Sequence, residues 1–144
     1  MANNTMSGKI VLVTGGTAGI GQVAALELAR QGAKVVIVGR NPEKTVRVVD
    51  TLRAASGNPQ IEYLLGDLSL QSEVRRVAAE FKQRYDRLDV LLNNAGGYFS
   101  QRQLTAEGLE YTFALNHLNY FLLTTSLLDV LQATGQARVI NVSS

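Results

Sequence analysis

The chain has 144 residues, of which 46% are hydrophobic and 18% charged, enough for one domain with a hydrophobic core of ordinary composition. It contains no cysteine, which excludes disulfides, thiolate catalysis and cysteine-ligated metal sites. The net charge of +2 comes from scattered basic residues, which argues against nucleic-acid binding. The N-terminus lacks an apolar signal core, and the apolar runs are shorter than the roughly 20 residues of a membrane span. We therefore expect a cytoplasmic protein without a metal or a membrane contact.

Short apolar runs alternate with longer segments of helical period along the whole chain. The run at residues 35–38 is apolar at every position, which indicates burial on both faces of a parallel sheet. Gly32 is placed to end a helix, Asn41 to cap a helix that starts with proline, and Ser69 to cap another. The pattern predicts strands at residues 9–13, 35–38, 61–65, 88–92 and 138–142, and helices at 20–31, 42–55, 70–85 and 106–133, the last of which Gly108 could interrupt.

This alternation predicts an α/β fold, a doubly wound parallel sheet of the Rossmann type in which right-handed crossovers give the strand order 3-2-1-4-5. No linker divides the chain, so residues 1–144 are expected to form one dinucleotide-binding domain that stops after the fifth strand. Ligands of such sheets bind at the carboxyl ends of the strands, where the order reverses. The glycine-containing turns at residues 15–21 and 93–97 should therefore face the same cleft.

The first of these turns follows an apolar strand and opens a helix. Its glycines stand at positions 15, 19 and 21, where they would let the backbone approach a pyrophosphate held by the N–H groups of the helix. The alternative is a tight turn that serves only close helix packing. On the first interpretation the cofactor-contacting residues of this turn are Thr14, Gly15, Thr17, Gly19, Ile20 and Gly21.

Arg40 follows the second strand at a position that decides between two nicotinamide cofactors. Sites specific for NAD usually carry a carboxylate here, whereas this chain has Gly39 and Arg40 and no acid before Glu43. A guanidinium group suits a 2′-phosphate, so we predict NADP, with NAD the weaker ligand. The alternative is a solvated arginine ahead of a helix.

The third and fourth strands end in further polar residues. Asp67, followed by Leu68, could accept a hydrogen bond from an adenine amino group, or it could share helix capping with Ser69. After the fourth strand, Asn93 is expected to satisfy backbone groups of adjacent strands. The backbone of Asn94, Ala95 and Gly96 would then pass beside the nicotinamide ribose.

Five short segments follow one another along the chain: Thr14-Gly15-x-x-x-Gly19-x-Gly21, Asp67-Leu68, Asn93-Asn94-Ala95-Gly96, Ala114-Leu115-Asn116-His117 and Val139-Ile140-Asn141-Val142-Ser143-Ser144. In this order they resemble the short-chain dehydrogenase/reductase family, over residues 8–144. The stretches at residues 104–110 and 121–124 are similar to its retinol-dehydrogenase-like branch.

The resemblance implies an oxidoreductase that moves a hydride between the nicotinamide of NADP and a small carbonyl or alcohol substrate. Ser144 matches the serine that hydrogen-bonds the substrate oxygen. Asn116 matches the helix asparagine whose backbone carbonyl holds a water in the proton relay. The family also forms homo-oligomers, so self-assembly is an expectation for the full-length protein.

One part of the family pattern is missing. The acid/base tyrosine and its lysine, spaced Tyr-x-x-x-Lys, should follow shortly after Ser144, and no earlier tyrosine has a lysine four residues later. Without general acid/base help a rate loss of about 10²–10⁴ is expected, so this segment should be inactive alone. If the natural chain ends at Ser144, a non-catalytic nucleotide-binding or interaction module is the alternative. A different Rossmann-type binder of a sugar nucleotide or adenylate is a third interpretation.

Overall fold

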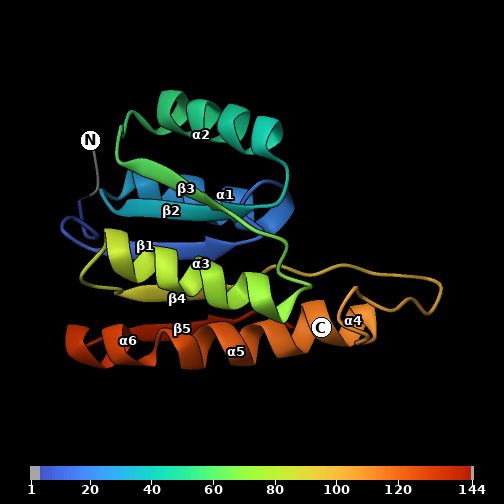
Figure 1. Ribbon diagram of the computed structural model, residues 1–144. Coiled ribbons are helices and arrows are strands. Elements are labelled where there is room, and N and C mark those ends of the chain that lie inside the picture. The colour runs from blue at the N-terminus through green and yellow to red at the C-terminus, as the bar shows by residue number, and fades with distance from the viewer. Residues whose placement is uncertain (1–3, 144) are drawn as a thin grey trace.

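The computed structural model describes residues 4–143, which form a five-stranded parallel sheet with the order β3-β2-β1-β4-β5 (Figure 1). The predicted α/β class and strand order are confirmed. The strands are β1 (Ile10–Thr14), β2 (Lys34–Gly39), β3 (Ile61–Leu65), β4 (Val90–Asn93) and β5 (Arg138–Asn141). The helices are α1 (Gly19–Arg30), α2 (Pro42–Ser56), α3 (Gln71–Arg84), α4 (Tyr111–Phe113), the π-helical turn η1 (Ala114–Leu118), α5 (Asn119–Ser126) and α6 (Leu128–Thr134).

Helices cover both faces of the sheet, with α3, α5 and α6 in front of it and α1 behind it in Figure 1. Successive residues of β1 point to opposite faces, so Leu12 joins the core under α3 and α5, and Val11 and Val13 join the core under α1 and α2. All three side chains are fully buried. Residues 11–13 and 35–38 of the central strands are therefore apolar and buried on both faces of the sheet, as the run at 35–38 predicts.

The helix caps agree with the prediction at two places and differ at a third. Asn41 accepts a hydrogen bond from the Lys44 N–H at 2.9 Å, and Gly32 adopts a φ of +92° after α1. Ser69 is not the cap of α3, which begins two residues later, at Gln71. Its hydroxyl donates to Asp67 at 2.6 Å, and the Glu107 carboxylate accepts from the first N–H groups of α3 in its place.

The last predicted helix, residues 106–133, starts later than expected and is interrupted. Residues 104–110 form a turn closed by a bridge between Leu104 and Glu110, with Gly108 at a φ of +78°. The Glu110 carboxylate accepts hydrogen bonds from the backbone N–H groups of residues 112 and 113, which fixes the helix start at Tyr111. The π-helical turn and a break at Leu127 then divide the helical segment into α4, α5 and α6.

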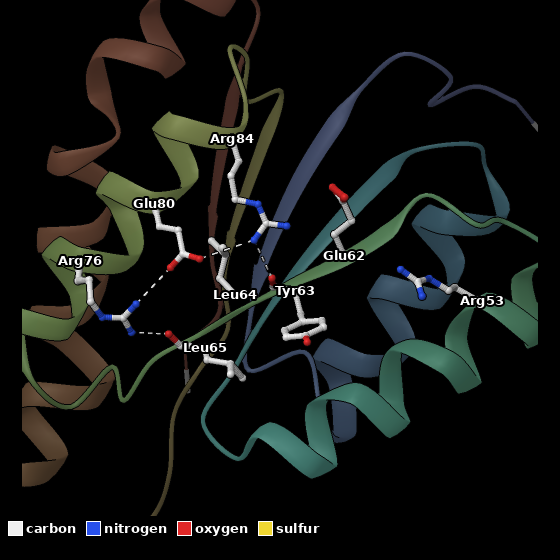
Figure 2. A pocket seen from close by; sticks show the side chains of 8 residues that line it. All are labelled: Arg53, Glu62, Tyr63, Leu64, Leu65, Arg76, Glu80 and Arg84. Atoms are coloured by element: carbon white, nitrogen blue, oxygen red, sulfur yellow. Dashed lines mark hydrogen bonds and ion pairs between the residues drawn. The ribbon is translucent and has the colours of Figure 1, made fainter.

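The free edge of β3 carries a row of arginine side chains from the helices on either side (Figure 2). The Gln60 carbonyl and the Gly66 N–H both form hydrogen bonds with β2. Because the carbonyl direction alternates along a strand, the carbonyl groups of residues 61, 63 and 65 point away from β2. Arg53 donates to the Ile61 carbonyl at 2.7 and 3.0 Å, Arg84 to the Tyr63 carbonyl at 3.2 Å, and Arg76 to the Leu65 carbonyl. A further strand could pair here only by displacing these guanidinium groups.

Replacing all three edge arginines, as Arg53→Ala, Arg76→Ala and Arg84→Ala, should increase self-association, because it exposes three strand carbonyls to another chain. Sedimentation velocity across a concentration series measures this. The matched control removes the same charge from exposed helix positions, as Arg30→Ala, Arg47→Ala and Arg75→Ala. Equal association of both triple variants would show that charge loss, not the open edge, is responsible.

Candidate nucleotide-binding cleft

The carboxyl ends of β1 and β4 lie side by side at the point where the strand order reverses, and a pocket of about 260 Å³ opens beside them. Seven predicted site residues line it: Gly15, Thr17, Arg40, Asp67, Leu68, Ala95 and Gly96. Phe99, Tyr111 and Leu115 complete the lining with Val38, Gly39 and Gly66. The turns after four different strands thus meet at one cleft, as the predicted topology requires.

Thr14 supports this cleft from inside the protein. Its side chain is fully buried, and its hydroxyl oxygen accepts hydrogen bonds from the backbone N–H groups of Asn94 at 2.9 Å and Ala95 at 3.0 Å. The same hydroxyl donates to the Leu92 carbonyl at 3.5 Å. These three bonds exhaust what a hydroxyl can make. The structure therefore gives the Thr14 hydroxyl a supporting place in the wall of the cleft, and the predicted cofactor contact of Thr14 stays a prediction.

Gly21 and Gly19, both in the first turn, meet different structural requirements: one allows close packing and the other a positive φ. A Cβ on Gly21 would overlap the Gly15 carbonyl and lie 2.5 Å from the Asn94 side-chain nitrogen, so α1 can approach β4 only without one. Gly19 has a φ of +53°, and the space where its Cβ would point is open. Close packing and an accessible backbone, the two alternatives raised by the sequence, therefore hold at different positions of one turn.

The start of α1 is the part of the cleft that suits a phosphate. Among the described residues no side chain caps this helix, and its first turn holds no acid. By contrast, Asn41 caps α2, and the Glu107 carboxylate accepts from the first N–H groups of α3 at 2.6 and 3.1 Å. Free N–H groups and the positive end of the helix dipole favour an anion, so the turn fits a pyrophosphate. Ile20, on the same turn, is 71% exposed.

Arg40 lies at the end of β2 with its guanidinium group exposed. Within residues 4–143 no carboxylate forms an ion pair with it. A Cβ on the preceding Gly39 would overlap the Thr45 hydroxyl and lie 2.9 Å from the Thr17 methyl group. A carboxylate therefore has no room at position 39, and the charged side chain at this end of β2 is the basic Arg40.

Asp67 both lines the pocket and holds a local turn. One of its carboxylate oxygens accepts from the Ser69 N–H at 3.1 Å and from the Ser69 hydroxyl at 2.6 Å. The pairing with Ser69 that we considered is present, but it closes the turn after β3 instead of capping α3. The other proposed role, an adenine contact, agrees with the place of Asp67 in the pocket wall.

Asn116 lies on the π-helical turn and clamps the loop after β4. Its amide oxygen accepts from the Gly97 N–H at 2.9 Å, and its amide nitrogen donates to the Gly97 carbonyl at 2.9 Å. The wider turn was not predicted, because no local signal in the sequence marks the position. In this π-helical turn the hydrogen bond from the Asn119 N–H to the Ala114 carbonyl spans five residues in place of four.

Asn116 also lines a second pocket, of about 410 Å³, whose lining includes Ser143. Ser144, the predicted substrate contact, lies outside the described residues.

Two further asparagines are buried near this hollow. Asn93 donates to the Thr124 hydroxyl at 3.1 Å and to the Asn141 side chain at 2.9 Å, so it bonds two side chains in place of the backbone groups that we expected. Asn119 is 1% exposed, and its amide oxygen has no hydrogen-bond partner among the described residues. The sequence did not single out Asn119, since an asparagine within a helix usually faces solvent.

Thr14→Val should lower the free energy of unfolding by about 2–4 kcal/mol, because it leaves two buried N–H groups unpaired without changing the side-chain size. Thr14→Ser keeps the oxygen and is the matched control, with a smaller loss from the missing methyl group. Urea denaturation measures both. If the valine variant is as stable as the serine variant, the hydroxyl does not hold the cleft together.

Known proteins are similar in sequence to almost all of the chain. The sequence profile of the short chain dehydrogenase family matches residues 9–144. The chain is 39% identical over 140 residues to retinol dehydrogenase 13 of Homo sapiens, covering 97% of this chain and 42% of that protein. It is 41% identical to human polyprenol dehydrogenase over 140 residues, covering 94% of this chain and 42% of that one. The chain thus spans about two fifths of the length of these curated relatives.

Solved structures show the same fold. The Pseudomonas aeruginosa RhlG/NADP active-site complex superposes with a TM-score of 0.85 at 33% identity, covering all of this chain and 57% of that one. A short chain dehydrogenase from Escherichia coli CFT073, complexed with NADPH, gives 0.83 at 29% identity over 99% of this chain and 61% of that one. The chain belongs to the short-chain dehydrogenase/reductase family of oxidoreductases, and retinol dehydrogenases are among its curated relatives.

Proposed function

We propose that this chain is the cofactor-binding part of an NADP-dependent oxidoreductase that acts on a small carbonyl or alcohol compound. The observation that carries the proposal is that two groups which attract anions, the N-terminus of α1 and the Arg40 side chain, lie at the same cleft. Among the described residues, no side chain caps the start of α1, which offers N–H groups to a pyrophosphate. No carboxylate there forms an ion pair with Arg40, which offers a guanidinium group to a 2′-phosphate. Two structural neighbours, complexed with NADP and with NADPH, support the choice of cofactor.

The residues of the cleft would divide the work of binding and orientation. The turn from Gly15 to Gly21 would hold the pyrophosphate, Arg40 the 2′-phosphate, and Asp67 with Leu68 the adenine. The backbone of residues 94–96, fixed by Thr14, would run beside the nicotinamide end. The bound nicotinamide supplies or accepts the hydride. Ser144 would polarise the substrate oxygen, and Asn116 would support the proton relay.

The proton that accompanies the hydride needs a separate acid/base group. The sequence holds no Tyr-x-x-x-Lys. Burial raises the pKa of Tyr120, whose hydroxyl donates to the Val142 carbonyl at 3.2 Å. A tyrosine with a raised pKa stays protonated at neutral pH and makes a poor catalytic base. We therefore propose that residues 1–144 bind the cofactor without completing the reaction. A non-catalytic nucleotide-binding module is the second candidate, because the features of the cleft support the binding of a nucleotide and do not bear on turnover.

Several sequence-based expectations stay predictions: the cytoplasmic location, self-assembly of the full-length protein, and the absence of nucleic-acid, metal and membrane contacts. No helix within residues 4–143 is long and apolar enough to cross a bilayer.

Arg40→Met should weaken NADPH binding about tenfold or more and leave NADH binding nearly unchanged, because only NADPH carries the 2′-phosphate. Fluorescence titration with each cofactor measures this. Arg47→Met, an exposed arginine on α2 outside the pocket lining, is the control and should change neither. Tighter binding of NADH than NADPH by the unaltered chain would overturn the proposed preference.

The complete natural protein should oxidise NADPH in the presence of at least one member of a panel of aldehydes, ketones and retinoids. The decrease in NADPH absorbance measures this reaction. Residues 1–144 alone should bind NADPH but show no turnover with the same panel. Binding without turnover by the complete protein would favour the non-catalytic module. No NADPH binding by either form would contradict both candidates.

A further inference from the structure

The segment between β4 and α4 extends beyond the sheet and returns to the start of α4 (Figure 1). Residues near both of its ends line the pocket. It is fastened at both ends. Asn116 holds Gly97 by the paired hydrogen bonds described above, and Glu107 accepts from the first two N–H groups of α3. These N–H groups lower the pKa of Glu107, so its carboxylate stays charged and the attachment persists at neutral pH. The segment therefore presents its side chains to the pocket from a fixed frame.

An aromatic pair joins the two ends of this segment. The rings of Phe99 and Tyr111 meet edge to face, with centroids 4.6 Å apart and planes at 62°. The Tyr111 backbone N–H also donates to the Gln103 carbonyl at 2.9 Å. Both rings line the 260 Å³ pocket. Tyr111 is thus held by ring packing and by its backbone, and it has only two side-chain torsions to restrict.

The Tyr111 hydroxyl meets Arg40 across the pocket. Its oxygen lies 3.4 Å from one terminal nitrogen of the guanidinium group, between residues that are 71 positions apart. This contact is a long hydrogen bond that engages one nitrogen, so it leaves the other N–H groups of the guanidinium available to a ligand. An exposed arginine otherwise loses much rotamer freedom when it binds a ligand. A rigid partner that holds the arginine before the ligand binds reduces this loss of conformational entropy.

We propose that Tyr111 is a positioning residue that sets selectivity for the 2′-phosphate by holding Arg40 in place. The inference rests on the proposed function, because it assumes that Arg40 binds this phosphate. It adds a residue on α4, far along the sequence from the end of β2, to the determinants of cofactor choice. It also assigns a role to the packing of Phe99 on Tyr111, which would hold the Tyr111 hydroxyl beside Arg40.

The test uses Tyr111→Phe, which removes the hydroxyl but keeps the ring that packs on Phe99. Calorimetric titration with 2′,5′-ADP and with 5′-AMP separates the phosphate from the rest of the nucleotide. The variant should bind 2′,5′-ADP about three- to tenfold more weakly and 5′-AMP as tightly as the unaltered protein. Tyr98→Phe is the matched control, since Tyr98 lies in the same segment and is 91% exposed, and it should change neither affinity.

The variants also separate this inference from the proposed function. Combining Tyr111→Phe with Arg40→Met should weaken 2′,5′-ADP binding no further than Arg40→Met alone, because Tyr111 acts through Arg40. An equal loss for both nucleotides, no loss at all, or a full additional loss in the double variant would overturn the positioning role. If Arg40→Met itself leaves the preference for 2′,5′-ADP unchanged, the proposed NADP selectivity fails as well.

Discussion

The Thr14 hydroxyl joins the two walls of the cleft, and the arrangement of the site depends on it. β1 and β4 are neighbours in the sheet but are separated by most of the described chain, so nothing local in the sequence holds their ends together. One buried oxygen accepts from two N–H groups of the loop after β4 and donates back to the strand. The Asn94 amide then reaches the carbonyls of Thr14 and Gly15 at 3.3 Å each. The glycine turn and the loop after β4 therefore form one rigid unit.

This joint leaves the N-terminus of α1 facing the open cleft, with its backbone N–H groups available. The other crossover helices have their starts satisfied by the protein itself, α2 by Asn41 and α3 by Glu107. Arg40 also lines this cleft, and in the described part of the chain it forms no ion pair, although Asp67 lines the same pocket. Position 39, beside it, admits no side chain. Both features favour an anionic ligand with phosphate groups at two places.

Much of this arrangement could be predicted from the sequence, because the signals are local. Apolar runs and glycine turns indicate the parallel sheet and its reversal point, and Asn41 followed by proline marks the start of α2. What the sequence could not show depends on distant partners. Glu107 caps a helix 36 positions away, and Tyr111 contacts Arg40 across 71 positions. The glycine spacing also could not separate Gly21, which allows close packing, from Gly19, whose backbone is open. The roles of Asn116 and Ser144 in catalysis come from the family resemblance and stay predictions.

The most direct test of the proposed nucleotide site is a titration of the chain with NADPH, monitored by two-dimensional amide NMR spectra. We expect the largest chemical-shift changes at the start of α1, at Arg40, and at residues 94–96. The change at Arg40 should be reproduced by 2′,5′-ADP and not by 5′-AMP. Shifts confined to the arginine-lined edge of β3 (Figure 2), or no shifts at saturating NADPH, would contradict it.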